Sequence, residues 1–467
     1  MESVIIIVFV MGYLAITLEH NLKLDKLIPA LIMMAVCWAL VALGVDNFTQ
    51  WFDSSQHGLV DGFASMGHDD KLHLVEETLL HHLGKTAEIL VFLLGAMTIV
   101  EIIDYFDGFS TIKGYVNFKS KKKLLWMFSI LAFILSAIID NLTATIVLIS
   151  ILQKIVKARE DRIWFAGLII VAANAGGAFS PIGDVTTTML WIGDKVSTGM
   201  LFTYLFIPSL LCMVVPSFLA TFLPAFKGDI EIDENEVEKP KSQYSGRMLY
   251  LGLGSILFVP IFKTVTHLPP YVGMMLSLGI VATFAEIYSN SKFSISSVEG
   301  GQADAHSSGA HHSPVHSSLS KIELPSILFF LGILMAVAAL ESLGILFNFA
   351  DSLKQGIPLM GTELSGTGVS DLVVILLGIG SAVIDNVPLV AASLGMFSEG
   401  LDDPLWHFIA FSAGTGGSML IIGSAAGVVA MGMEKIDFFW YFKKISWLAL
   451  IGFLVGSAAF VVIRMFV

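Results

Sequence analysis

Residues 136–141 and 381–386 read SAIIDN and SAVIDN, so the chain carries one six-residue motif twice, once in each half. Each copy places an aspartate, Asp140 or Asp385, followed by an asparagine inside a long apolar stretch. An ionised aspartate near the centre of a bilayer costs roughly 2.5–3.5 kcal/mol on insertion scales. Because the chain meets this cost twice, we interpret the two aspartates as functional residues of a membrane transporter with two related half-sites.

The composition is typical of an integral membrane protein. Only 14% of the residues are charged, the mean hydropathy is +0.80, and apolar runs long enough to cross about 30 Å of hydrocarbon recur along the chain. The net charge of −13 argues against nucleic acid as a partner. The sequence has no Ser–His pair, zinc-ligand spacing or phosphate loop, so we expect neither an enzyme nor a cofactor.

Residues 124–157 form an apolar segment of unusual length. As one helix they would measure roughly 50 Å, too long for a bilayer, whereas two full crossings need about 40 residues. Basic residues flank the segment at 119–123 and 154–162, which by the positive-inside rule places both ends in the cytoplasm. We therefore predict a hairpin that enters from the inside, with Asp140 near its tip. The second copy, 371–398, has acidic flanks and is predicted to enter from the outside.

A second pair of related segments follows the two hairpins. Residues 162–192 contain ANAGGAFSPIGD and residues 404–433 contain AGTGGSMLIIGS, with the glycines aligned at a constant offset. Glycine pairs and a proline in the middle of a span indicate a broken helix, whose freed carbonyls can meet an ion. The predicted fold class is an all-α integral membrane protein with an inverted structural repeat, two re-entrant helical hairpins and two discontinuous transmembrane helices.

The sequence divides into four regions. We expect N-terminal transmembrane helices and an external polar loop in 1–86, the first repeat in 87–223, an acidic cytoplasmic linker in 224–246, and the second repeat in 247–466. The second repeat contains a loop rich in His and Ser, 289–322, which we expect to be disordered. Its histidines could instead bind a metal or sense pH; they are His306, His311, His312 and His316.

The quoted motifs carry a family resemblance. SAIIDNLTAT, ANAGGAFSPIGDVTT, SAVIDNVPLVAA and AGTGGSMLIIGSAAG together resemble the NhaD-type sodium/proton antiporters, over roughly residues 87–466. These belong to the wider ion transporter superfamily, which includes sodium-coupled dicarboxylate carriers. The resemblance implies inverted repeats and commonly a homodimer of scaffold and transport domains. We expect a multi-pass protein of a bacterial inner membrane that exchanges cytoplasmic Na⁺ or Li⁺ for external H⁺ and serves pH homeostasis.

Oxygen-rich side chains at the motifs form the predicted site. Sodium and lithium are hard cations that prefer oxygen ligands. The residues predicted to bind the ion or exchange protons are Asp140, Asn141, Thr143, Asp184, Asp385 and Asn386, with Na⁺ held at Asp140, Asn141, Asp385 and Asn386. Supporting roles are predicted for Asn174, Ser180, Thr186, Thr187, Ser418 and Glu341.

The predicted mechanism is competition. Carboxyl groups buried near one another hold protons more readily, so H⁺ and Na⁺ compete for the same oxygens. If only the loaded forms cross between inward- and outward-facing states, this competition gives obligatory exchange.

Other interpretations remain open. Asp140, Asp184 and Asp385 could simply cap short helices, which is a common task for aspartate. A sodium-coupled symporter of dicarboxylate or another organic anion is the main alternative function, although Arg and Lys are scarce inside the spans. Hairpins and broken helices can also build a channel, which would conduct without proton coupling.

Overall fold

Helices make up nearly all of the regular structure. The computed structural model describes the chain except for residues 54–57, 114–117, 231–243, 300–312, 350–368 and 384. Within the described part, strands occur only as a short antiparallel pair, β1 (Phe52–Asp53) and β2 (Gly58–Leu59). The predicted helical class is confirmed, with this small ribbon as the exception.

Seven of the described helices are long and apolar enough to cross a membrane, as expected of a multi-pass membrane protein. They are α4 (His68–Tyr105), α6 (Lys121–Ile139), α10 (Thr198–Ala220), α11 (Ser245–Thr266), α12 (Pro270–Glu299, spanning over 270–289), α14 (Leu324–Ser342) and α21 (Ser446–Arg464). Two shorter apolar helices, α1 (Glu2–Thr17) and α3 (Leu27–Leu43), lie near the N-terminus. Small elements join the larger ones: α2 (Glu19–Leu22), η1 (Val45–Asn47), η2 (Phe63–Ser65), α5 (Ser110–Lys113), η3 (Pro224–Phe226), α13 (Pro314–Leu319) and α20 (Phe438–Lys444).

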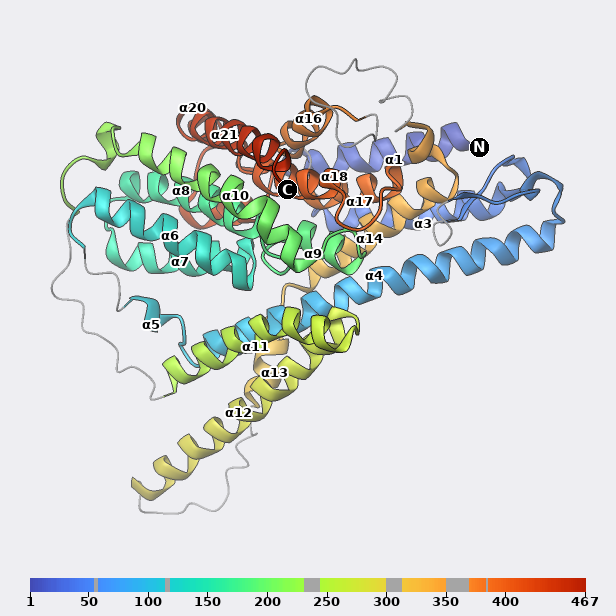
Figure 1. Ribbon diagram of the computed structural model, residues 1–467. Coiled ribbons are helices and arrows are strands. Elements are labelled where there is room, and N and C mark those ends of the chain that lie inside the picture. Colours follow the sequence, from blue (N-terminus) through green and yellow to red (C-terminus); the bar gives the residue numbers. More distant parts are fainter. Residues whose placement is uncertain (54–57, 114–117, 231–243, 300–312, 350–368, 384) are drawn as a thin grey trace.

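Helix α4 differs from the sequence-based expectation. We expected a polar loop up to residue 86, but α4 begins at His68 and continues without a break to Tyr105. At 1.5 Å per residue its 38 residues measure about 57 Å, well beyond the hydrocarbon thickness. Charged residues near its start carry the helix out of the apolar region, and Figure 1 shows it extending past the other helices.

In each half of the chain, two consecutive helices meet at that half's copy of the repeated motif. Helix α6 is followed by α7 (Asn141–Ile155), with only Asp140 between them, and α16 (Asp371–Ser381) is followed by α17 (Asn386–Met396). We refer to residues 139–143 as the first tip and to residues 382, 383 and 385–387 as the second tip. Asp140 has a φ of +94°, which breaks the helix and reverses the chain direction within a single residue.

Two interrupted helices pack against these pairs. Helix α8 (Arg159–Ala178) stops before α9 (Val185–Ile192), and α18 (Pro404–Gly416) stops before α19 (Ala425–Glu434). The glycines permit close packing, since a Cβ on Gly176 would lie 2.1 Å from the Phe133 carbonyl oxygen. A Cβ on Gly416 would lie equally close, 2.1 Å, to the Gly378 carbonyl oxygen. The two halves therefore use glycine for the same helix contact.

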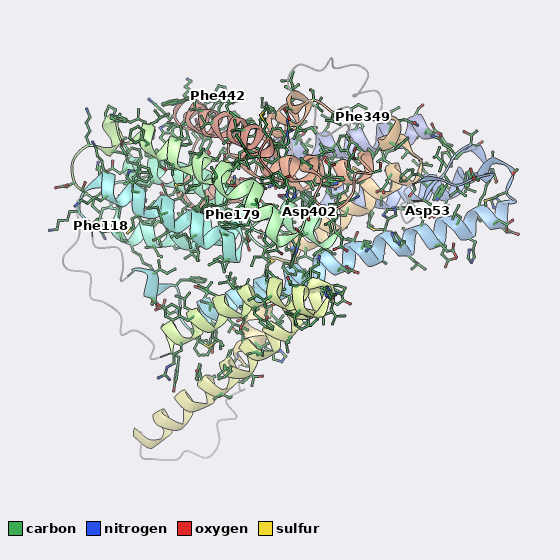
Figure 2. The ribbon with its side chains drawn as sticks, in the orientation of Figure 1. Asp53, Phe118, Phe179, Phe349, Asp402 and Phe442 are labelled. Atoms are coloured by element: carbon green, nitrogen blue, oxygen red, sulfur yellow. The ribbon has the colours of Figure 1, made fainter. Side chains whose placement is uncertain are left out.

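Matching hydrogen bonds reinforce this packing in both halves. Ser136 Oγ donates to the Ala173 carbonyl at 2.6 Å, and Ser381 Oγ donates to the Ala413 carbonyl at 2.8 Å. In the first half, Phe179, which is labelled in Figure 2, follows α8. Its ring stacks on that of Phe133 in α6, with the ring centres 5.0 Å apart. Each tip is thereby fixed against an interrupted helix.

The helices form two groups. Helices α6–α10 and α16–α21 pack on one another and form the hairpin group; α1, α3, α4, α11, α12 and α14 form the peripheral group. In Figure 1, α4 runs with α11 and α12 along one side of the hairpin group, while α1 and α3 lie with α14, which contacts α17. Contacts of α14 with α17 and of α4 with α9 join the groups. The tips lie near this junction.

Within the region 289–322, where we expected disorder, residues 289–299 and 314–319 are helical. Helix α12 continues to Glu299, and α13 packs against α4 and α12. Ser313 donates a hydrogen bond to Glu286, which holds the start of α13. His306, His311 and His312 lie outside the described residues, as do residues 231–243 of the acidic linker.

Candidate cation site

The first tip holds Asp140 in a defined position. Asp140 is the N-cap residue of α7: its Oδ1 accepts from the Thr143 backbone N–H at 2.6 Å, and its Oδ2 accepts from Thr143 Oγ1 at 3.0 Å. The capping role considered from the sequence is therefore present. A serine or asparagine would cap equally well, so capping leaves the negative charge unexplained.

Asp184 is the point at which both tips meet. It caps α9, and its Oδ1 accepts from the backbone N–H and the hydroxyl of Thr186, both at 2.9 Å. Its Oδ2 accepts from Asn141 Nδ2 of the first tip at 2.8 Å and from Asn386 Nδ2 of the second tip at 3.2 Å. Asp184 is only 2% exposed. One buried carboxylate thus joins two asparagines that are far apart in the sequence.

A chain of amides extends from Asp184 to the other interrupted helix. Asn141 Nδ2 also lies 3.0 Å from Asn174 Oδ1, and Asn174 Nδ2 donates to Ser424 Oγ at 3.0 Å. Ser424 caps α19 as Asp184 caps α9. Ser424 occupies the position of Asp184 in the second half, a sequence signal that could have marked it as a site residue.

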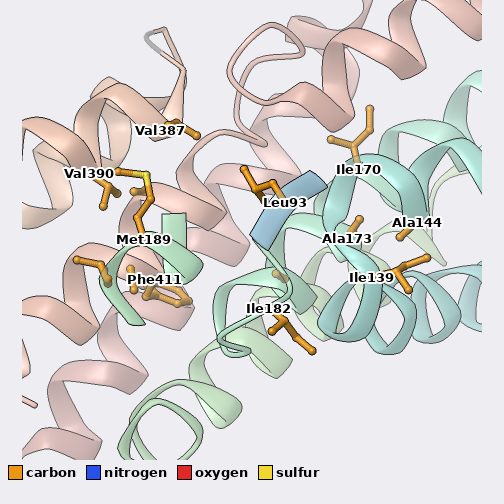
Figure 3. Packing of buried hydrophobic residues seen from close by; sticks show 14 of the residues in the cluster. Leu93, Ile139, Ala144, Ile170, Ala173, Ile182, Met189, Val387, Val390 and Phe411 are labelled. Atoms are coloured by element: carbon orange, nitrogen blue, oxygen red, sulfur yellow. The ribbon is translucent and has the colours of Figure 1, made fainter. Parts of the chain in front are cut away.

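A small cavity lies between the tips. It has a volume of about 60 Å³, enough for several water molecules at the ~10–15 Å³ that one needs. Its polar lining consists chiefly of Lys26, Asp140, Asn141, Asp184, Asp385 and Asn386. Apolar side chains close it, and among these Leu93, Ile139, Ile182 and Val387 are seen in Figure 3. Three carboxylates face one lysine, so the cavity attracts cations.

Two further cavities lie beyond the first tip. The larger, of about 440 Å³, is lined by the tip residues Leu142 and Thr143 and by several charged side chains: Glu101, Asp104, Asp107, Glu323, Lys154 and Lys321. The smaller, of about 130 Å³, is lined by Lys26, Leu142 and Glu323 among others. Leu142 lines all three cavities. The first tip therefore separates the central cavity from larger, more polar spaces.

The structure does not bring every predicted residue to the cavity. Asn174 and Thr186 belong to the hydrogen-bond network, and Thr187 Oγ1 donates to the Asp184 backbone carbonyl at 2.9 Å. Ser180, Ser418 and Glu341 do not line the central cavity. Glu341 instead packs against α17, where a Cβ on Gly395 would meet its side chain.

Lys26 is the site residue that the sequence did not reveal. It precedes α3, and its Nζ lies 3.2 Å from Asp385 Oδ2 and 4.5 Å from the centre of the Phe329 ring. A lysine at a helix N-terminus is unfavourable for the helix dipole, which was a weak signal that it has a partner elsewhere. Unlike Asp140, Asp385 makes no capping hydrogen bond to its own helix.

Within the described part of the chain, no three His, Cys, Asp or Glu side chains come together in the manner of a transition-metal site. A cation in the central cavity would rely on amide, hydroxyl and backbone oxygens as well as carboxylates. That mixture suits a hard monovalent cation.

The chain is similar to known transporters. The citrate transporter family model matches residues 6–406. Sodium/proton antiporter 2 of Arabidopsis thaliana is 35% identical over 98% of this chain and 99% of its own length, and sodium/proton antiporter 1 of the same plant is 38% identical over 98% and 72%. The Na⁺/H⁺ antiporter NhaD of Alkalimonas amylolytica is 31% identical over 95% of this chain and 86% of its own.

A solved structure shares the fold. The YdaH transporter of Alcanivorax borkumensis aligns with a TM-score of 0.58 over 94% of this chain and 98% of its own, at 11% identity. At that identity the likeness concerns the fold alone. The family match and the curated relatives identify the chain as a member of the citrate transporter family and, within it, of the NhaD-type sodium/proton antiporters.

Proposed function

We propose that the protein exchanges cytoplasmic Na⁺, or Li⁺, for external H⁺. The observation that carries this proposal is the meeting of both tips at Asp184, in a small cavity lined by three carboxylates and one lysine. The names of the relatives, which are sodium/proton antiporters, support the same exchange. A site of this charge favours a monovalent cation over an anion.

The proposed ligands are those predicted from the sequence, with Asp184 given the central place. Of these, Asp140, Asn141 and Asn386 would contact Na⁺ from the two tips while Thr143 orients Asp140, and Asp385 contributes its charge through its pair with Lys26. Asp184 lies between the two asparagines and would share the ion. Protons bind the same carboxylates, so each ion displaces the other.

The proposed cycle alternates access to this one site. The matched Ser136 and Ser381 hydrogen bonds, and the matched glycine contacts, support an inverted repeat in which each tip is a re-entrant hairpin beside a discontinuous helix. The larger cavity beyond the first tip, which Lys154 and Lys321 line, would be the cytoplasmic access route. Movement of the hairpin group against the peripheral group would transfer access to the other side.

A sodium-coupled symporter of dicarboxylate or another organic anion is the second candidate, because the family description names citrate, an organic anion. Such a carrier needs cationic or amide groups that are available to carboxylates of the substrate. Among the described residues, Lys26 is the only basic side chain in the lining of the central cavity, and it is already paired with Asp385. This makes the symporter less suitable.

Three further expectations remain part of the proposal. The proposed location is a bacterial inner membrane, and relatives of the chain occur both in Alkalimonas amylolytica and in Arabidopsis thaliana. A homodimer is expected from the family resemblance. A role in pH homeostasis follows if proton movement is coupled to sodium.

Proton flux in proteoliposomes tests the function. Purified protein is reconstituted with a preset pH gradient, and NaCl, LiCl, KCl, choline chloride or sodium succinate is added in turn. Collapse of the gradient by sodium or lithium chloride, but not by choline chloride, supports exchange. Sodium-dependent uptake of radiolabelled succinate without that response would favour the symporter.

Variants at the tips test the site. Asp140→Asn and Asp385→Asn should each strongly weaken sodium-dependent proton flux while the protein still inserts. Asp161→Asn is the control, since Asp161 pairs with Lys121 at 2.7 Å outside the central cavity and its loss removes one carboxylate of similar exposure. Wild-type sodium affinity and turnover in Asp140→Asn would leave capping of α7 as the better explanation for Asp140, and the same result in Asp385→Asn would leave only its ion pair with Lys26.

A further inference from the structure

The aspartates of the two tips have different partners. Asp140 is held by Thr143 of its own tip, whereas Asp385 is held by Lys26, which lies 359 residues away and precedes α3 of the peripheral group. The two side chains are largely buried, with exposed fractions of 23% for Lys26 and 15% for Asp385. Their ion pair therefore joins the two helix groups at the wall of the cavity.

Lys26 lies in an acidic environment beyond this pair. The carboxylates that face it come from the segment before α3, from the segment before α14 and from the cavity itself: Glu19, Asp25, Glu323, Asp140, Asp184 and Asp385. Tyr13 of α1 is within electrostatic reach of Asp385. The Phe329 ring lies against the ammonium group and adds a cation–π contact. In the part of the chain that the structure describes, Lys26 is the one positive side chain that lines the central cavity.

We propose that Lys26 is a tethered cation that neutralises Asp385 and thereby sets the affinity of the central cavity for both Na⁺ and H⁺. The inference rests on the proposed exchange and deepens it. In the described arrangement the ammonium group occupies the place beside Asp385 that a sodium ion would otherwise take. Asp140 and Asp184 are left as the carboxylates on which the mobile ions compete.

The proposed role of Lys26 is to balance charge, and it predicts the direction in which each variant shifts the binding of protons and sodium. Removing its positive charge makes the cavity more negative, so protons are held more tightly and are released only at higher pH. Sodium is also held more tightly. Removing the charge of Asp385 while Lys26 remains makes the cavity more positive, and both effects reverse. A neighbouring charge shifts a titration by about 1 to 3 pH units, so we expect midpoint shifts of about 1 unit.

The experiment compares four proteins in proteoliposomes: wild type, Lys26→Met, Asp385→Asn and the double variant. The readouts are the midpoint pH of sodium-driven proton flux and the half-saturating Na⁺ concentration at alkaline pH. Lys26→Met should move the midpoint to higher pH by about 1 unit and lower the half-saturating concentration. Asp385→Asn should move the midpoint to lower pH. The double variant should return towards wild type, because the two charges cancel.

Two controls separate a charge effect from a structural one. Lys26→Arg keeps the positive charge and should keep the wild-type midpoint. Lys121→Met removes a comparable ion pair, with Asp161, outside the cavity and should not shift the midpoint. Thermal melting of the four proteins in detergent gives a double-mutant cycle that reports the pair independently of transport.

The outcomes distinguish a failure of the proposed sodium/proton exchange from a failure of the proposed role of Lys26. Wild-type vesicles without sodium-driven proton flux would overturn the proposed exchange, and Lys26 could not then set its ion affinity. Wild-type exchange with an unshifted Lys26→Met midpoint would overturn only the role of Lys26. A double variant as weak as Asp385→Asn would show that Asp385 is itself an essential sodium ligand, which would also contradict charge compensation.

Discussion

Replacement of Asp184 by asparagine separates the charge of this residue from its helix cap. Asparagine caps a helix about as well as aspartate, so the backbone N–H of Thr186 keeps an acceptor. The negative charge is lost, and the new amide group is placed opposite the donating amides of Asn141 and Asn386. The variant should therefore fold but bind cations poorly.

The size of the effect follows from the geometry of the cavity. A monovalent cation in a cavity of about 60 Å³ lies within roughly 4 Å of Asp184, where two unit charges interact by about 4 kcal/mol at an effective dielectric constant of 20. Rearrangement of water and of the other carboxylates would recover up to about half of this energy, leaving a loss of about 2–4 kcal/mol. That loss corresponds to about 30- to 1000-fold weaker sodium binding.

The assay is sodium-dependent proton flux in proteoliposomes over a range of NaCl concentrations. Asp184→Ser is the companion variant, because serine is the residue that caps the equivalent helix at Ser424. It removes the charge and keeps a capping oxygen. If both variants were correctly inserted and showed half-saturating Na⁺ concentrations within about threefold of wild type, Asp184 would not be a cation ligand.

Two predictions concern stability, measured by thermal melting of the detergent-solubilised protein. Gly176→Ala should lower the free energy of unfolding by about 3 kcal/mol or prevent folding, because its Cβ would lie 2.1 Å from the Phe133 carbonyl oxygen. Gly279→Ala is the control, since Gly279 has open space around it. Equal melting temperatures for the two variants would contradict the packing argument. The Asp371 carboxylate accepts two charged hydrogen bonds from Arg464, of 2.6 and 2.9 Å. Arg464→Met should lower the free energy of unfolding by about 3–5 kcal/mol, because Asp371 then loses this partner. Adding Asp371→Asn should restore part of that loss, and a double variant less stable than Arg464→Met alone would refute this.

The unequal halves of the site have a chemical consequence. The two interrupted helices are capped by Asp184 and Ser424 at equivalent positions, and the two tips carry Asp140 and Asp385. Only Asp385 is paired with a lysine. A symmetric framework therefore carries an asymmetric charge distribution, with the net negative charge concentrated on the side of Asp140 and Asp184.

Much of this molecule could be predicted from the sequence because the relevant signals are local. Hydropathy indicates membrane helices, and Asp140, which lies between two apolar runs, indicates a helix break. Helix capping and a positive φ involve only neighbouring residues, so a local sequence signal can predict them. The repeated motif indicated that both tips matter. It also led to the family resemblance that the relatives bear out.

The tertiary structure decided which site residues contact one another. Asp184 bonds Asn386 across 202 residues, and Asp385 pairs with Lys26 across 359. Such contacts depend on which helices pack side by side and on the depth at which each one is interrupted, and neither is encoded in the hydrophobic pattern of a single segment. The sequence by itself located Asp140, Asp184 and Asp385 within long apolar segments. Only the packing of distant helices determined which of the three is paired with a positive charge, because electrostatic partners are set by distance in space and not by position along the chain.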